Sequence, residues 1–187
     1  MSAGSDDEIV LKPRVPRPMP APMNAPKLEL TAVLEDTQRV RAASDADAAA
    51  RLDTALRLLE NSDQNELLAE TALALATYEW RARRDPARAL ARAETALATV
   101  TQADAPLAWL RLQNLVSAAH ADAGALLEAI PPALAVRRLA GDDEESQLEQ
   151  GQATTQIGWL LLELGDRDGA ELHLREGAAG GAAPHVR

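Results

Sequence analysis

The stretch that most constrains the fold of this chain is Ala153–Ala178, ATTQIGWLLLELGDRDGAELHLREGA. Apolar residues recur at the spacing of one helical face between Ile157 and Leu164, and Gly165 ends that run. A second run of helical spacing begins directly after this glycine. The stretch therefore predicts two helices joined by a tight turn.

The same two-helix unit recurs upstream at a nearly constant interval of about 40 residues. A small residue of each second helix is expected at Ala49, Ala89, Ala129 and Ala170. The turn before each alanine is expected at Ser44-Asp45, Arg84-Asp85, Gly124-Ala125 and Gly165-Asp166. Small side chains let neighbouring helix axes approach to about 8–10 Å. The period predicts about four stacked helix pairs over residues 27–179.

This arrangement resembles the tetratricopeptide (TPR) repeat. The residues that carry the likeness in the last unit are Ile157-Gly158, Leu161, Gly165-Asp166, Ala170, Leu174 and Gly177. The period is longer than the standard TPR period of about 34 residues and is similar to that of the longer variant in kinesin light chains and bacterial signalling proteins. The resemblance implies an all-α, right-handed superhelical array of about eight helices. Its repeat-packing positions would be Ala49, Ala89, Ala129, Ala170, Gly158 and Gly165.

The third unit departs from the pattern at Pro131-Pro132. Proline inside a helix removes a hydrogen bond and costs about 3 kcal/mol or more. We expect the second helix of this unit either to begin late, at about Ile130, or to be kinked, and the register at Ala129 depends on which occurs.

Aspartates precede several of the expected helices. Asp45 and Asp85 come before helical runs as N-caps, and Pro86 follows Asp85 at the first helical position. Asp104, with Pro106 close behind it, is expected to open another helix.

Two further acidic pairs have the spacing of a capping box. They are Asp63 with Glu66, and Asp142 with Glu145. The acidic run that begins at Asp142 is thus interpreted as a solvated helix start and not as a metal site.

Composition supports a helical protein and excludes some partners. The chain of 187 residues is 47% hydrophobic, mostly Ala and Leu with no Phe, and these residues favour helices. Its net charge of −10 argues against nucleic acid as a partner. No apolar run reaches the roughly 20 residues that span a bilayer, so no membrane contact is expected. The acidic start lacks the apolar region of a secretory signal, and we expect a cytoplasmic protein.

The two ends differ from the repeats. Residues 1–26 contain six of the eleven prolines and are expected to form a disordered leader. Pro13 and Pro16 have the PxxP spacing of an aromatic-groove ligand, which is the alternative interpretation of this leader. Residues 180–187 are expected to be a flexible C-terminal end.

No pattern indicates catalysis. His120, His173 and His185 lack the spacing of metal ligands, and the chain has no cysteine. Nucleotide-binding glycine motifs and the nucleophile-elbow motif are also absent from the sequence. We expect no enzyme, no cofactor and no metal.

A stacked array presents the first helix of each pair on a concave face where a peptide or partner helix binds. Candidate groove residues, taken from the face opposite the packing stripe, are Tyr78, Arg81, Arg111, Asn114, Gln152, Thr155 and Trp159. Exposed Tyr, Trp and Arg are typical binding residues. For Tyr78 and Trp159, simple packing against neighbouring helices is an equal alternative.

Two functions follow from these expectations. The first is a non-enzymatic scaffold that binds a protein or peptide partner in its groove. The second is a sensory or dimerising N-terminal module of a bacterial signalling protein, of the diguanylate cyclase or histidine kinase type. The last repeat lacks a polar capping helix in the sequence, so a homodimer through that repeat is a possible form.

Overall fold

The computed structural model describes residues 30–180, and all regular structure within them is helical. The helices are α1 (Leu30–Ala43), α2 (Ala46–Leu59), α3 (Asn65–Arg81), α4 (Pro86–Thr99), α5 (Pro106–Asp122), α6 (Leu126–Leu139), α7 (Glu144–Glu163) and α8 (Arg167–Gly180). For the described residues, the prediction of an all-α fold with about eight helices is confirmed. The leader expected over residues 1–26 and the end expected over residues 181–187 lie outside the described residues.

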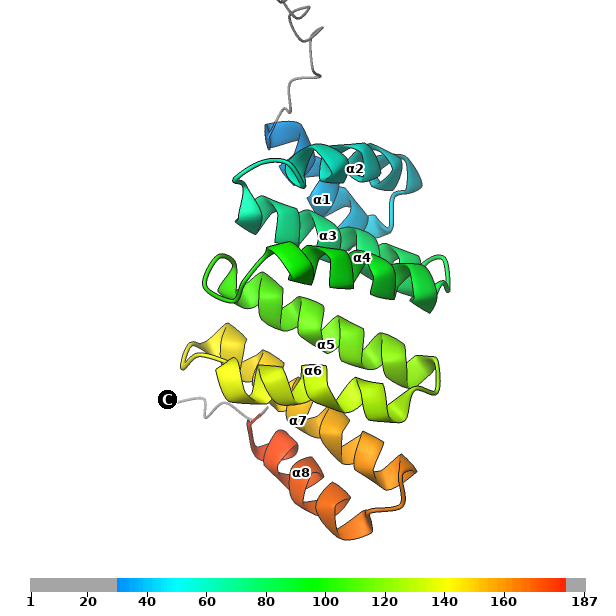
Figure 1. The fold of residues 1–187 in the computed structure, drawn as a ribbon, viewed down its shortest axis with the longest axis vertical. Coiled ribbons are helices and arrows are strands. Elements are labelled where there is room, and N and C mark those ends of the chain that lie inside the picture. Colours follow the sequence, from blue (N-terminus) through cyan, green and yellow to red (C-terminus); the bar gives the residue numbers. More distant parts are fainter. Residues whose placement is uncertain (1–29, 181–187) are drawn as a thin grey trace, which may run out of the picture.

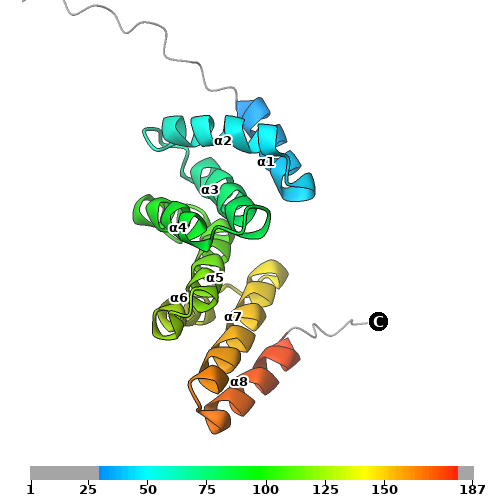
Figure 2. The same cartoon turned by 90° about the vertical axis from the view of Figure 1, so that its right-hand side faces the viewer.

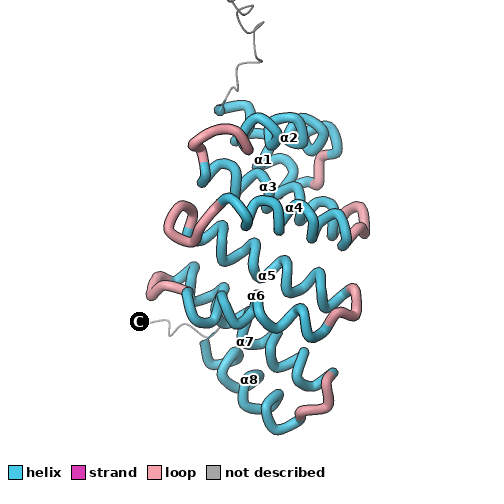
Figure 3. The backbone as a smooth tube through the Cα atoms, in the orientation of Figure 1, coloured by secondary structure: helices cyan, strands magenta, loops and turns pink. Residues whose placement is uncertain are grey.

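The helices form four pairs that stack along the longest axis, from α1–α2 at one end to α7–α8 at the other (Figures 1 and 2). Each helix packs against its neighbours in sequence, and α1 also contacts α3, α3 contacts α5, and α5 contacts α7. The short turns within pairs lie along one edge of the stack, and the connections between pairs lie along the other (Figure 3). This is the arrangement of a helical repeat array.

Each turn within a pair contains one residue in the left-handed region of backbone space. These residues are Ser44 (φ 50°), Arg84 (φ 57°), Gly124 (φ 77°) and Gly165 (φ 88°). At the last turn, the Gly165 N–H donates to the Leu162 carbonyl at 3.0 Å and the Asp166 N–H to the Leu161 carbonyl at 2.9 Å, as in a Schellman motif. All four residues belong to the turns that the period of the sequence predicts.

The alanines that recur at the same position in each second helix are buried. Ala49 is 5% exposed, Ala89 and Ala129 are 0% exposed, and Ala170 is 1% exposed. One core cluster of buried side chains extends from α1 to α5, and a second joins α5, α6 and α7. The core is therefore distributed along the array between successive pairs.

The two prolines of α6 do not delay its start. The helix begins at Leu126 and includes Pro131 and Pro132, so the first of the two alternatives, a late start near Ile130, is wrong. The carbonyls that lose their helical donors belong to Leu127 and Glu128, two exposed residues whose backbone water can reach. Because Ala129 is fully buried, the third unit keeps the register of the others.

Two expected caps are corrected by the structure. Helix α3 begins after Gln64 without a side-chain cap, so Asp63 and Glu66 form no capping box. The cap of α7 is Asp143, whose Oδ1 accepts the Ser146 N–H at 2.9 Å, one residue later than the expected Asp142.

Two other caps agree with expectation. Asp45 accepts the N–H groups of Asp47 and Ala48, and Asp85 accepts the N–H of Arg88 with Pro86 at the start of α4.

Across the described residues, no helix has both the length and the hydropathy required to cross a membrane.

Candidate binding groove

The first helices of the four pairs line one continuous hollow. Its walls come from Arg41 of α1, from Trp80 and Arg81 near the end of α3, and from positions on α5 and α7. The hollow has a volume of about 480 Å³. It exists because α1, α3, α5 and α7 contact one another in turn, whereas the second helices of the pairs do not. We call this hollow the groove.

The structure brings four of the seven candidate residues together in the groove. Arg81, Arg111, Asn114 and Gln152 all line it, and they come from three different helices.

The other three candidates lie elsewhere. Thr155 and Trp159 line a second hollow on α7. Tyr78 lines neither hollow, and its partly buried side chain packs against the core cluster that spans α1 to α5.

Ion pairs hold the α5 side of the groove. The Arg111 Nε lies 3.0 Å from Glu149 Oε1, and its Nη2 lies 3.2 Å from Glu145 Oε2. Asn114 Nδ2 donates to Glu149 Oε2 at 2.9 Å and to the Glu149 carbonyl at 3.1 Å. Glu149 is 6% exposed, so it ties α5 to α7 at the wall of the groove.

The three arginines of the groove differ in their partners. Arg41 pairs with Glu70, and Arg111 pairs with the two glutamates described above. Arg81 makes no ion pair with any described residue, and its guanidinium carbon lies 5.7 Å from the centre of the Trp80 ring. Trp80 is fixed in turn, because its Nε1 donates to Asp122 Oδ2 at 2.7 Å. Among the described residues, the groove therefore contains one positioned cation without a carboxylate partner.

Sequence reasoning missed Arg41, Trp80 and Glu149 as groove residues. The period contains a signal for the first, because Arg41 lies one repeat period before Arg81 and occupies the same place in its repeat. No such signal exists for Glu149, since the equivalent positions in the other repeats are apolar, as at Leu68 and Ala108.

The second hollow lies where α7 meets α8. It has a volume of about 440 Å³ and is lined by Leu148, Gly151, Thr155 and Trp159 of α7 together with Gly177 of α8. Trp159 is 55% exposed and Leu148 is 49% exposed. This surface is apolar, in contrast to the groove.

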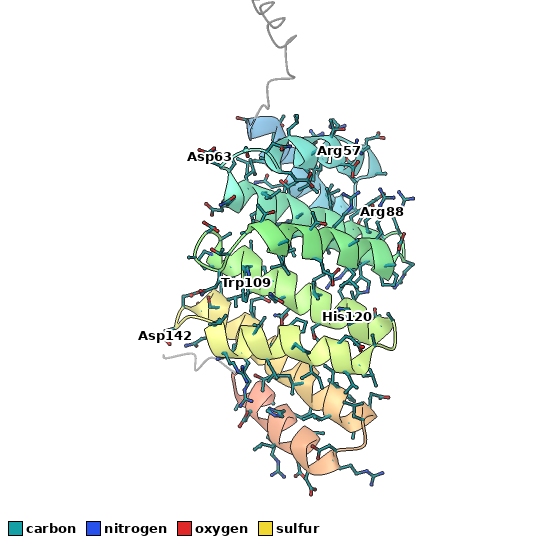
Figure 4. The ribbon with its side chains drawn as sticks, viewed as in Figure 1. Arg57, Asp63, Arg88, Trp109, His120 and Asp142 are labelled. Atoms are coloured by element: carbon teal, nitrogen blue, oxygen red, sulfur yellow. The ribbon has the colours of Figure 1, made fainter. Side chains whose placement is uncertain are left out.

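A further polar cluster joins α2, α3 and α4 away from the groove. Glu79 is 3% exposed and lies 3.1 Å from Arg88 Nε, 3.4 Å from Arg83 Nε and 3.5 Å from Arg92 Nη2. Arg92 also pairs with Asp53 of α2. Arg88 lies at the edge of the stack that carries the short turns (Figure 4). These contacts connect consecutive helices and have the geometry of a structural network.

Each described histidine lies near one glutamate. His120 Nε2 lies 3.9 Å from Glu94, and His173 Nδ1 lies 3.6 Å from Glu176. Within residues 30–180, no three His, Asp or Glu side chains are grouped so that they could hold a metal ion. His185 lies outside this range.

Comparison with known proteins gives no relative: no protein-family model, no curated protein and no solved structure matches the chain.

Proposed function

We propose that this chain is a non-enzymatic protein–protein interaction module of the TPR type, and that the groove binds an extended peptide segment that carries acidic side chains. The observation that carries the proposal is Arg81, a groove cation that has no ion pair among the described residues and stacks on Trp80. An arginine fork held by an aromatic ring is well suited to bidentate recognition of a carboxylate.

The charge distribution supports an acidic ligand. The chain has a net charge of −10, yet three arginines and one glutamate line the groove. Arg41 and Arg111 are paired with Glu70, Glu145 and Glu149. Among the described residues, Arg81 is therefore the groove cation that is left to attract an acidic side chain.

Asn114 helps to fix the wall of the groove. Its Nδ2 donates to Glu149. Its Oδ1 is buried and has no donor among the described residues, so it is not open to a ligand. The recognition of an acidic segment therefore depends on Arg81.

Selection from a library of random dodecapeptides tests the proposal. We expect the selected peptides to be enriched in Asp and Glu, and their affinity to fall as salt is raised, because the contacts are ionic. Arg81→Gln should weaken binding of a selected peptide about tenfold or more, as for loss of a charged hydrogen bond.

Arg175→Gln is the matched control. Its side chain is 79% exposed, lies on α8 and pairs with Glu171, so binding should be unchanged. Selection of basic or purely apolar peptides, or an equal effect of both substitutions, would contradict the assignment of the groove.

A further inference from the structure

One helix face at the end of the array carries large apolar side chains without a neighbour. Leu148, Trp159 and Leu162 of α7 are 49%, 55% and 38% exposed. Together with Gln152 and Thr155 they recur at helical spacing and share one face of α7. We call these five residues the α7 stripe.

Comparison of successive repeats indicates which kind of structural element packs on this face. A shift of one repeat period relates Arg111 and Asn114 of α5 to Gln152 and Thr155 of the stripe. On α5 those two positions make the contacts to Glu149 of the next first helix, α7. The α7 stripe is therefore the surface of the last described pair that is equivalent to the one on which α5 receives α7.

The stripe contains both a projecting ring and a hollow. Trp159 projects from the helix, and the hollow of about 440 Å³ extends two turns away, to where Gly151 of α7 meets Gly177 of α8. Gly177 packs so closely that a Cβ there would clash with Thr155 Oγ1 and lie 2.9 Å from the Thr155 backbone nitrogen. Glycine at residue 177 therefore lets α8 approach α7 closely at this end of the hollow.

The Trp159 ring and the glycine end of the hollow lie at positions that a two-fold rotation would exchange. Residues 151 and 159 are about 12 Å apart along a helix that rises about 1.5 Å per residue, and Thr155 lies midway between them. Leu148 and Leu162 are also equally distant from Thr155 along the chain. A rotation of 180° about an axis through Thr155, perpendicular to α7, therefore exchanges ring with hollow and one leucine with the other.

We propose that a second copy of this chain covers the α7 stripe in an antiparallel, two-fold contact centred on Thr155. Trp159 of each copy fills the hollow at Gly151 and Gly177 of the other, and Leu148 packs against Leu162 across the axis. Such a contact is isologous and closes on itself. It is also the self-association that a dimerising module requires, and the stripe shares Gln152 with the lining of the groove.

The stripe has no charged side chain with which to recognise a partner through ion pairs. Two copies that each carry a net charge of −10 repel one another, so a shared interface must avoid carboxylates. The α7 stripe consists of three apolar and two uncharged polar side chains. Added salt should therefore strengthen the dimer by screening the repulsion, whereas it should weaken peptide binding in the groove.

Sedimentation equilibrium of the full chain, from about 1 μM to about 1 mM, tests the proposal. We expect a monomer–dimer equilibrium whose dissociation constant rises about 30-fold or more in Trp159→Glu, the effect of losing a buried aromatic anchor. Circular dichroism should show unchanged helix content, because this side chain is exposed in the isolated chain.

Leu172→Glu is the matched control, since Leu172 is 56% exposed on α8 and outside the stripe. It should leave the dissociation constant unchanged. A monomer at every concentration would overturn the proposal, and so would a dimer that Leu172→Glu dissociates and Trp159→Glu does not.

Cysteine cross-linking tests the orientation, because the chain has no cysteine of its own. Leu148→Cys and Leu162→Cys chains, mixed and oxidised, should form the mixed disulfide faster than either chain links to itself. Faster formation of the 148–148 product would overturn the antiparallel arrangement.

Discussion

Gly158 of α7 lies directly against Leu174 of α8. A Cβ at residue 158 would stand 2.7 Å from the Leu174 Cγ and 3.1 Å from the Leu174 backbone nitrogen. Carbon atoms in contact are ordinarily about 3.5–4.0 Å apart, so this position has no room for any side chain. The glycine of the Ile157-Gly158 motif is therefore a site of close helix approach.

Gly158→Ala should destabilise the protein by about 1–3 kcal/mol, the usual cost of overpacking. The direction is informative, because alanine is a better helix former than glycine by about 1 kcal/mol and would stabilise an open helix position. The free energy of unfolding in urea measures the change.

A double substitution separates the steric cause from others. In a Leu174→Ala background, where the branched side chain is removed, Gly158→Ala should cost less than in the natural chain. Equal costs in the two backgrounds would show that Leu174 is not the obstacle.

Ala170→Leu should destabilise the last pair by about 1–3 kcal/mol through overpacking. Ala170 is 1% exposed at the repeated small position of α8. Ala178→Leu, a change of the same volume at an exposed position of the same helix, should have little effect on thermal unfolding. If both substitutions are neutral, the register of the repeat is wrong at this helix.

Substitutions at the left-handed turn residues should lower stability where a glycine is replaced and raise it where a glycine is introduced. Gly165→Ala should cost about 1 kcal/mol, the penalty of the left-handed region for a residue with a Cβ. No atom lies within 4 Å of a Cβ at this position, so the effect on urea unfolding isolates the backbone conformation.

Arg84 occupies the equivalent turn with φ 57° and makes no ion pair with a described residue. Arg84→Gly should therefore stabilise the chain, by up to about 1 kcal/mol in urea unfolding, since the relief of strain exceeds the added flexibility of glycine. Loss of stability on this change would indicate a role for the arginine side chain.

The repeat itself was predictable from the sequence, because its period fixes both a turn and a small residue in each pair. The turn requires a residue that can adopt the left-handed region of backbone space. The close approach of two helices requires a small side chain such as alanine. That is why Ser44 and Ala49 could be located even in the first unit, where the motif is weakest.

The groove was harder to predict, because a single helix does not indicate which of its faces its neighbours cover. Helix α3 contacts α1, α2, α4 and α5, and every residue from Thr71 to Ala76 is buried. The face of α3 that was expected to bind a ligand is therefore covered by neighbouring helices in the middle of the helix. From α3 the groove is lined by Leu73 in the middle of the helix and by Thr77, Trp80 and Arg81 further along, while Tyr78 packs inward.

Contacts within a loop explain why one helix cap was predicted incorrectly. Asp104 was expected to open α5, but its side chain accepts the Thr101 N–H at 2.9 Å and the Thr101 hydroxyl at 2.7 Å. This bond closes the loop between α4 and α5 instead of capping the helix. Spacing alone does not distinguish these two uses of an aspartate.

Acidification should weaken the first helix pair through Asp36 and Arg51. The Arg51 Nε and Nη2 lie 2.7 and 2.6 Å from the two carboxylate oxygens of buried Asp36, and this hydrogen-bonded guanidinium lowers the pKa of that carboxyl below its usual value. A lowered pKa in the folded state means that the stabilisation is complete above the unfolded pKa of about 3.9 and is lost as the pH falls through the folded value. Asp36→Asn should therefore destabilise the chain at pH 7, and the difference from the natural chain should shrink below about pH 4. Urea unfolding at a series of pH values measures this difference, and a difference that stays constant down to strongly acidic pH would show that the ion pair contributes nothing.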